Sequence, residues 1–471
     1  MNDQSSPVPE LPTTLQWLNS PSYTLREHRG QPVALAFVNV ASVWCMQRLT
    51  ELFRWRARNP GQVQVVAVHV PRFDAERDPQ YVLKSIRSYG ISLPIIHDAD
   101  WRAWRQYGIQ SWPTVLLIDE TGHERERLVG LTNDLESRLV ALSERPSSSY
   151  SVRSFRENDP EPHVSLRFPA GLAATGDRLY IADSGHHRVL ECSLDGRVRR
   201  QFGLGLPDFI DGTLSGAAFN RPQGLVLERD TLYVADVDNH ALRRIDLMTG
   251  HVSTLCGNGR PGKILEGHVV QPNEFSLHYP QDLAVAHNQL YIAMAGDNQV
   301  WRFDLGTNEL FRCAGNGALD MEDGEASKAS FAQPMGIVAV QHTLYVCDAL
   351  GSALRSVQLQ TRAVQTMIGS GLWKYGNQDG QRANALMQYP RAISLSQETP
   401  VLWIADAGNG SLRSLRLGGG ELSTESLPRT LNIPSALAVA EGTVWIAETG
   451  SHNIVRYDIA SSKMRDIPIE E

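Results

Sequence analysis

The stretch LYIADSGHHRV (residues 179–189) recurs five more times along the chain in altered form. The later copies are LYVADVDNHAL (232–242), LYIAMAGDNQV (290–300), LYVCDALGSAL (344–354), LWIADAGNGSL (402–412) and VWIAETGSHNI (444–454). A proline-led line precedes each copy, and its prolines are Pro169, Pro222, Pro280, Pro334, Pro390 and Pro434. These prolines stand 44 to 58 residues apart, a period typical of a four-stranded propeller blade.

The segments between the copies support the same unit. A strand of alternating apolar and polar residues follows each copy. The strand after that one, the fourth of the blade, often ends in a Gly-x-Gly turn. Asp-Gly stands 11 residues before the blade proline three times, at Asp211, Asp323 and Asp379. We therefore predict an all-β, six-bladed propeller over residues 164–471. KMRDIPI (463–469) is expected to be the last blade's own fourth strand, residues 150–155 are a weak candidate for a further strand, and the way the ring closes stays open.

The first part of the chain has a different pattern. Apolar runs such as VALAFVNV (33–40) and VQVVAVHV (63–70) alternate with helical spacing at 46–58 and 76–89. Buried parallel strands with helices between them predict an α/β domain over residues 1–143. Residues 144–163 are rich in Ser, Pro and charge, which is typical of a linker.

The net charge, the apolar runs and the cysteine count exclude several classes of protein. A net charge of −8 over 471 residues argues against nonspecific nucleic-acid binding, which needs a basic face. No run of 18 apolar residues and no signal sequence is visible, so we expect no membrane segment and a cytoplasmic location. Five widely spaced cysteines fit a reducing compartment and no zinc pattern. We expect no cofactor, and the oligomeric state is not readable.

One segment of the α/β domain carries candidate chemistry. In VALAFVNVASVWCMQRLTELF (33–53) a strand runs into a helix, and Cys45 stands at the junction. Thiol-disulfide exchange in a Cys-x-x-Cys site uses an attacking thiolate and a resolving thiol, whereas this chain has Ser42 three residues before Cys45. A serine hydroxyl is far too weak an acid for that role, but Ser42 can cap the helix by accepting a backbone N–H bond.

The repeat resembles the NHL repeat, and the order of the domains resembles the NHL repeat-containing protein 2 family. The resemblance runs from LQWLNS (15–20) through HDAD (97–100) and SWPT (111–114) to the last blade. It implies a thioredoxin-like domain with its motif at 42–45 and a cis-proline, Pro113, opposite it. Relatives carry Cys-x-x-Cys there, so Ser42 replaces the first motif cysteine and Cys45 matches the second.

Cys45 has three interpretations. It is an inert apolar residue, a single slowly reacting thiol, or half of a working dithiol that takes its partner from elsewhere. A peptide groove that needs no redox chemistry is a separate possibility. In thioredoxin folds the backbone before the cis-proline pairs with extended segments, and we expect such a groove at Trp44, Trp112 and Pro113.

The propeller offers two sets of polar residues. Acids end the repeated line at Asp183, Asp236, Asp348, Asp406 and Glu448, and Met294 breaks the set. We favour turn acids that accept backbone N–H bonds over a ring of metal ligands. The turns that follow are expected to form a binding surface on one face, with candidate residues His186, His187, Asn239, His240, Asn409 and His452.

These observations lead to competing functions. The first is a protein-binding scaffold with a protein or peptide partner. The second is a thiol-disulfide oxidoreductase or redox sensor that uses Cys45. A third, a propeller hydrolase or lyase with a bound metal, would require stoichiometric metal, and we expect no metal site.

Overall fold

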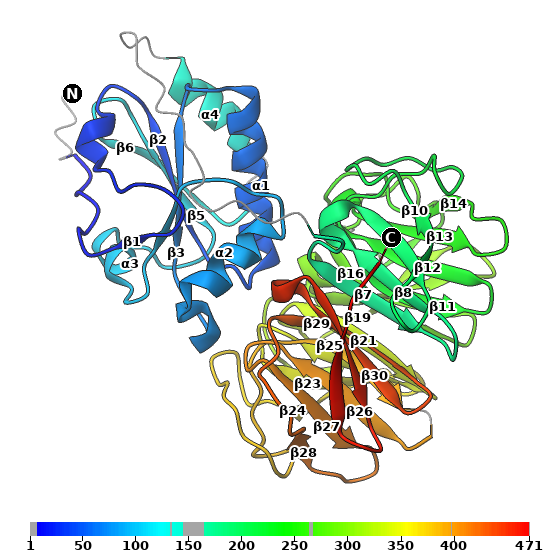
Figure 1. Cartoon of the computed structure of the whole chain (residues 1–471). Helices are drawn as coiled ribbons and strands as arrows, with labels where there is room; N and C mark the ends of the chain where they lie inside the picture. Colours follow the sequence, from blue (N-terminus) through cyan, green and yellow to red (C-terminus); the bar gives the residue numbers. More distant parts are fainter. Residues whose placement is uncertain (1–6, 132–133, 145–163, 263–266, 397, 471) are drawn as a thin grey trace. The chain divides into compact units, whose positions relative to one another are not determined.

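The computed structural model describes residues 7–131, 134–144, 164–262, 267–396 and 398–470. The chain forms two compact units, residues 1–162 and 163–471 (Figure 1). All of the predicted linker except residue 144, and the candidate strand at 150–155, lie outside the described residues and stay predictions.

The N-terminal unit is built on a six-stranded sheet in the order β1-β4-β3-β2-β5-β6. β2 pairs in parallel with β3, and β3 with β4, whereas β5 and β6 extend the sheet antiparallel. The strands are β1 (Gln16–Trp17), β2 (Val33–Val38), β3 (Gln64–His69), β4 (Ile95–His97), β5 (Thr114–Ile118) and β6 (Glu124–Val129). The apolar runs at 33–40 and 63–70 are strands β2 and β3, as the sequence predicted.

Helices cover both faces of this sheet. Apolar side chains of α1, α2 and α4 form one core with alternate residues of the central strands. α3 and the segment before β2 pack against the other face. The helices are α1 (Val43–Arg58), α2 (Pro79–Arg87), α3 (Arg102–Gln106) and α4 (Leu135–Ser143). β2 is buried along its whole length, which explains its continuous apolar sequence.

The second unit is a six-bladed β-propeller, as the repeats predicted. Each blade is an antiparallel sheet of four main strands, and blades 3 and 4 each carry one short extra strand. Blade 1 contains β7 (Pro169–Ala174), β8 (Leu179–Asp183), β9 (Arg188–Cys192) and β10 (Val198–Phe202). Blade 2 contains β11 (Pro222–Glu228), β12 (Thr231–Asp236), β13 (Ala241–Asp246) and β14 (Val252–Cys256).

The remaining blades repeat this plan. Blade 3 contains β15 (His268–Val269), β16 (Pro280–Ala286), β17 (Gln289–Met294), β18 (Gln299–Asp304) and β19 (Leu310–Ala314). Blade 4 contains β20 (Gly324–Glu325), β21 (Pro334–Val340), β22 (Thr343–Asp348), β23 (Ala353–Gln358) and β24 (Ala363–Ile368). Blade 5 contains β25 (Pro390–Ser396), β26 (Val401–Asp406), β27 (Ser411–Arg416) and β28 (Leu422–Thr424). Blade 6 contains β29 (Pro434–Ala440), β30 (Thr443–Glu448), β31 (Asn453–Asp458) and β32 (Lys463–Ile467).

The last blade supplies its own fourth strand, β32, as predicted. Glu470, three residues after the end of β32, closes the ring. The backbone of Glu470 accepts a hydrogen bond from Val198 N–H at 2.9 Å and donates one to the carbonyl of Gly196 at 3.1 Å. The hydroxyl of Thr449 adds a bond to the carbonyl of Pro169 at 2.7 Å. Hydrogen bonds from Glu470 and Thr449 of blade 6 to residues of blade 1 therefore close the ring.

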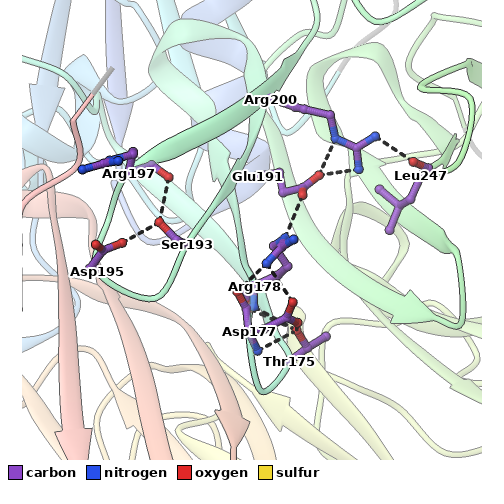
Figure 2. A network of polar contacts seen from close by, with 9 residues as sticks. All are labelled: Thr175, Asp177, Arg178, Glu191, Ser193, Asp195, Arg197, Arg200 and Leu247. Carbon is purple, nitrogen blue, oxygen red and sulfur yellow. Dashed lines mark hydrogen bonds and ion pairs between the residues drawn. The ribbon is translucent and has the colours of Figure 1, made fainter.

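A buried carboxylate of blade 1 holds an arginine that reaches blade 2. Figure 2 shows Glu191 between Arg178 and Arg200, with its oxygens 3.1 Å and 2.6 Å from the two Nε atoms. Arg200 also donates to the carbonyl of Leu247 in blade 2, at 2.7 Å. Because Glu191 is only 6% exposed, these charged bonds are screened less than surface pairs are.

Candidate functional site

The motif segment lies where β2 ends and α1 begins. Ser42 is the N-cap residue of α1, and its hydroxyl oxygen accepts a bond from Cys45 N–H at 3.5 Å. Ser42 has extended backbone angles, φ −87° and ψ 119°, as N-cap residues do. The serine therefore has the capping role expected from the sequence.

Cys45 lies one turn inside the helix and is buried. Its relative exposure is 0%, and it belongs to the core formed by α1, α2 and α4. Burial raises the pKa of the Cys45 thiol to about 12, despite lowering contributions from Asn39 and Ser42. A thiol in this state is a poor nucleophile, since the thiolate is the reactive form.

A buried glutamate that the sequence did not single out holds the loop before α1. The Glu76 carboxylate accepts bonds from Ala41 N–H at 3.1 Å and Asn39 Nδ2 at 2.7 Å. It also accepts the backbone N–H groups of Arg72 and Phe73 at 2.6 and 3.0 Å. Burial raises the pKa of Glu76, and its charge adds to the raised pKa of Cys45. A single Glu in a short helical turn gave no signal for this role.

The Trp112-Pro113 peptide is cis, as the resemblance implied. The carbonyl of Pro113 accepts a bond from Gly130 N–H at 2.8 Å. The carbonyl of Gly130 in turn accepts a bond from Arg48 of α1 at 3.0 Å. Because Arg48 follows Cys45 by three residues, this chain of bonds fixes the proline loop relative to the motif helix.

Half-buried tryptophans stand beside the proline loop. The Trp112 ring lies 5.3 Å from that of Trp101 and 4.6 Å from that of Trp104, between centroids. Trp44, in the first turn of α1, is also half-buried. Trp44 and Trp112 were predicted from the sequence, but Trp101 and Trp104 were not, because no pattern in the sequence shows that the loop before Pro113 packs against them.

The propeller turns have a structural role that was not predicted from the sequence. Nδ1 of His187 accepts the N–H of Arg221 at 3.1 Å, and Nδ1 of His240 accepts the N–H of Tyr279 at 3.3 Å. The same bond is made at three further seams by Asn298 to Gln333, Ser352 to Tyr389 and His452 to Phe168. Each acceptor is a turn side chain of one blade, and each donor precedes the proline of the next blade. We call these bonds the seam bonds.

The seam bonds correct part of the predicted binding surface. His240 and Asn239 are each only 5% exposed, so they are not surface residues. A constant spacing in the sequence could have predicted the seam bonds. Every acceptor stands four positions after the last residue of the second strand of its blade. Blade 5 has Gly410 at this position, which has no side chain to accept the bond. Burial lowers the pKa of His187 to about 4, so its ring is neutral at pH 7 and one of its nitrogens can accept a hydrogen bond.

Three other candidates bind the acid of their own blade. His186 Nδ1 lies 2.8 Å from Asp183 Oδ2. The amides of Asn239 and Asn409 donate to Asp236 and Asp406, both at 2.8 Å. His186 and Asn409 keep partial exposure, so of the six surface candidates these two, His187 and His452 are still accessible in part.

The blade acids accept backbone bonds, as favoured from the sequence. Asp183, Asp236, Asp348, Asp406 and Glu448 each accept the N–H two residues before their own blade proline, at 2.7–2.8 Å. Each also has an arginine partner, namely Arg188, Arg243, Arg355, Arg413 and Arg429. The carboxylates are thus already engaged within their blades.

Blades 2, 4 and 5 extend this pair into a buried network. In blade 2, Arg243 lies 2.7 Å from Asp236 and 2.8 Å from Asp211. Asp211 belongs to the Asp-Gly pattern and also accepts the N–H and hydroxyl of Thr254 at 3.0 and 2.8 Å. The counterparts are Arg355 with Asp323, and Arg413 with Asp379. The regular spacing of Asp-Gly before the blade proline therefore reflects an ion-pair network.

Blade 3 lacks both the acid and the arginine that form the buried ion pair in blade 2. Met294 occupies the position of Asp236, and Trp301 occupies that of Arg243, as the strand registers show. Both side chains are fully buried. Replacing a buried ion pair by apolar groups is often close to neutral, whereas removing one partner is costly.

Comparisons with known proteins agree with this two-part structure. The NHL repeat family matches residues 166–192. The chain is 32% identical to Protein SUPPRESSOR OF QUENCHING 1, chloroplastic, of Arabidopsis thaliana, over 96% of this chain, and it spans about half of that relative, 46%. It is 28% identical to NHL repeat-containing protein 2 of Gallus gallus, over 98% of this chain and 71% of that protein. Its relatives also include the thiol-disulfide oxidoreductase YkuV of Bacillus subtilis, 27% identical over 26% of this chain and 84% of that protein.

No helix among the described residues is both long and apolar enough to cross a membrane.

Proposed function

We propose that this NHL repeat-containing protein 2-like chain, a thioredoxin-like domain followed by an NHL propeller, acts mainly as a protein-binding scaffold. In this proposal Ser42 stands in place of the first cysteine of a Cys-x-x-Cys motif. The thioredoxin-like domain then binds an extended peptide without thiol exchange, and the propeller supplies a rigid support with further loops.

The state of Cys45 carries the proposal. Its side chain is fully buried, and its pKa is raised to about 12. At neutral pH the thiol therefore stays protonated, whereas an attacking cysteine must be a thiolate. The serine hydroxyl, three residues earlier, caps the helix instead of offering a second sulfur.

The peptide groove is proposed at Trp44, Trp112 and Pro113. Half-buried tryptophans offer large apolar faces at low entropic cost, which suits peptide binding. The bonds from Arg48 through Gly130 to Pro113 hold the loop in place. A preorganised site loses less free energy on binding than a mobile one.

The alternative is a redox function for Cys45 alone, as an oxidoreductase or a sensor. The similarity to a thiol-disulfide oxidoreductase favours it. It would require Cys45 to leave the core or a partner thiol to reach it.

One experiment separates the two functions. The full chain is used to isolate partners from cells, with and without dithiothreitol, beside Cys45→Ala and the double variant Trp44→Ala/Trp112→Ala. The scaffold proposal predicts partners that persist in reductant and with Cys45→Ala but are lost with the double variant. Partners that disappear in dithiothreitol and with Cys45→Ala would overturn it in favour of redox function. If the double variant binds the same partners as the wild type, the proposed groove at Trp44, Trp112 and Pro113 is wrong.

A further inference from the structure

The outermost strand of a propeller blade has an open edge unless another segment pairs with it. In this propeller, five of the six outermost strands have such a backbone partner among the described residues. Glu470 bonds to Val198 of β10, β15 pairs with β19, and β20 pairs with β24. Single glycines pair with β14 and β28. The exception is β32 of blade 6, whose one strand partner in the described part of the chain is β31.

The two glycines show what an added partner does at this edge. In blade 2, Gly212 N–H donates to the carbonyl of Val252 at 3.0 Å, and the carbonyl of Gly212 accepts the N–H of Val252 at 2.8 Å. In blade 5, Gly380 and Leu422 exchange the same two bonds, both at 2.9 Å. The backbone groups of Val252 and Leu422 therefore point outward, away from the rest of their blades.

Met464 of β32 occupies the position of Val252. It lies opposite Tyr457 of β31, just as Val252 lies opposite Ile245 of β13. Tyr457 and Ile245 both stand nine positions after the last residue of the second strand of their blade. The N–H and the carbonyl of Met464 therefore also point outward, and neither has a hydrogen-bond partner among the described residues.

A short connection before blade 6 explains the open edge. β28 ends at Thr424 and β29 begins at Pro434, whereas β10 ends at Phe202 and β11 begins at Pro222. The connection before blade 6 is thus about half as long as the one before blade 2. It has no segment that corresponds to Gly212.

A hollow of about 600 Å³ lies along β32. Lys463, Met464 and Arg465 line it, together with Leu427 and Pro428 of the short connection. Successive side chains of a strand point to opposite faces, so a space that touches all three residues of β32 lies beside the strand. Met464 and Leu427 pack against the same apolar core, which makes one side of the hollow apolar.

The opposite face of β32 is basic. Lys463 and Arg465 are exposed, and Arg465 lies directly opposite Arg456 of β31. Like charges at opposite positions of a ladder destabilise it, and neither arginine forms an ion pair among the described residues. Asp458 also lines the hollow and lies opposite Lys463, so one carboxylate faces three cations. A carboxylate beside Arg465 would relieve this excess of positive charge.

We propose that β32 binds an extended acidic segment of another protein, which adds to blade 6 as a further strand. The backbone of that segment makes the two bonds that Gly212 makes in blade 2. Its side chains next to Lys463 and Arg465 are carboxylates, and the one between them is apolar and lies beside Met464. A second copy of β32 fits poorly, because it would bring more cations to this edge. The site does not depend on the groove proposed in the N-terminal unit.

The probe is a fluorescein-labelled peptide of alternating glutamate and valine residues, whose fluorescence anisotropy is followed as the full chain is added. One control peptide has lysine in place of glutamate. A second has N-methyl groups on its backbone amides, so it cannot donate hydrogen bonds to β32. Because these peptides are tested on the wild-type protein, the proposal can fail even if a variant does not fold.

Two variants of the protein test the edge itself. Met464→Pro removes an N–H that β31 does not use, and proline is tolerated on edge strands. Arg465→Glu reverses a charge. Its matched control is Arg199→Glu, because Arg199 is an exposed arginine on the outermost strand of blade 1. Circular dichroism checks that each variant is folded, and sedimentation velocity measures the oligomeric state.

We expect the acidic peptide to bind saturably to the wild type and to Arg199→Glu, with a Kd that rises with salt. Arg465→Glu should raise the Kd about tenfold or more, because it places like charges together. Met464→Pro and the N-methylated peptide should each raise it about fivefold or more, from lost backbone hydrogen bonds.

No saturable binding, equal binding of either control peptide, or an unchanged Kd in the folded variants would each overturn the proposal. A dimer of the full chain that dissociates in Met464→Pro would place a second copy at this edge and would overturn it as well.

Discussion

Nδ1 of His452 accepts a hydrogen bond from the backbone N–H of Phe168, 3.0 Å away across 284 positions of sequence. It is the seam bond that joins the last blade to the first. His452 has a left-handed backbone with φ 55°, a conformation that Asn and Gly adopt more readily than Ala. Other blades use His, Asn or Ser at the same position, and one has Gly, so the chain itself suggests the substitutions to test.

We predict that His452→Ala destabilises the propeller by about 1–3 kcal/mol, because it leaves the N–H of Phe168 without its acceptor. His452→Asn should cost much less, since Asn298 makes this bond in blade 3. His452→Gly should lie between them, because it relieves the backbone but supplies no acceptor. Urea unfolding monitored by fluorescence ranks the three variants. Equal effects of Ala and Asn would contradict a role for the bond.

The network in blade 2 gives a second prediction. Arg243→Met should destabilise the protein by about 3–5 kcal/mol, because the carboxylate of Asp236 is left buried without a cation. Adding Asp236→Asn removes that charge, so the double variant should be more stable than Arg243→Met alone. The matched control is Arg244→Met on the same strand. A double variant that is no more stable than Arg243→Met would rule out this electrostatic account.

The sequence predicted the propeller well because its features are local and repeated. The blade prolines and the strands recur in all six blades and the Asp-Gly pair in three, so a strand misassigned in one blade is corrected by comparison with the others. The turn acids were interpreted correctly for the same reason, since their backbone donors lie in the same blade.

The rest depends on contacts between distant segments. The acceptor role of His240 is decided by Tyr279 in the next blade, and composition gave no sign that this turn is buried. The burial of Cys45 and the four bonds of Glu76 likewise depend on how separate loops meet.

A histidine pair gives a prediction about pH. Nδ1 of His69 lies 3.1 Å from Nδ1 of His97 inside the N-terminal unit. Burial, then the neighbouring His97, lowers the pKa of His69 well below 6.5, and burial also lowers that of His97. The unfolded chain therefore binds protons below pH 6.5 that the folded chain excludes, so this part of the stability is present above pH 6.5 and is lost as pH falls.

We expect the stability advantage of the wild type over His69→Asn to shrink by about 1 kcal/mol between pH 6.5 and 5.5, from one excluded proton. Hydrogen exchange of peptides from β3, corrected for intrinsic rates, measures it locally. His251→Asn changes an exposed histidine and should show no such trend. An advantage that stays constant or grows on acidification would refute the assignment.

Adding a second sulfur should change the chemistry of the motif segment. We predict that Ser42→Cys forms an intramolecular disulfide with Cys45 on mild oxidation, because the new thiol lies at the N-terminus of α1, where free N–H groups lower its pKa. Thiol titration should show two thiols fewer after oxidation, and insulin reduction should appear in the variant. Ser42→Ala is the control, with a stability loss of about 1 kcal/mol from the missing cap. A wild type as active as Ser42→Cys would contradict the substitution account.

The most direct measurement is the alkylation rate of Cys45 against pH in the folded full chain, followed by mass spectrometry of its peptide, with Cys45→Ala as the blank. The scaffold proposal predicts negligible reaction from pH 6 to 9 and rapid reaction once denaturant is added. A native rate that rises around a pKa well below the usual value of about 8.5 would show an exposed, activated thiolate and contradict the proposal.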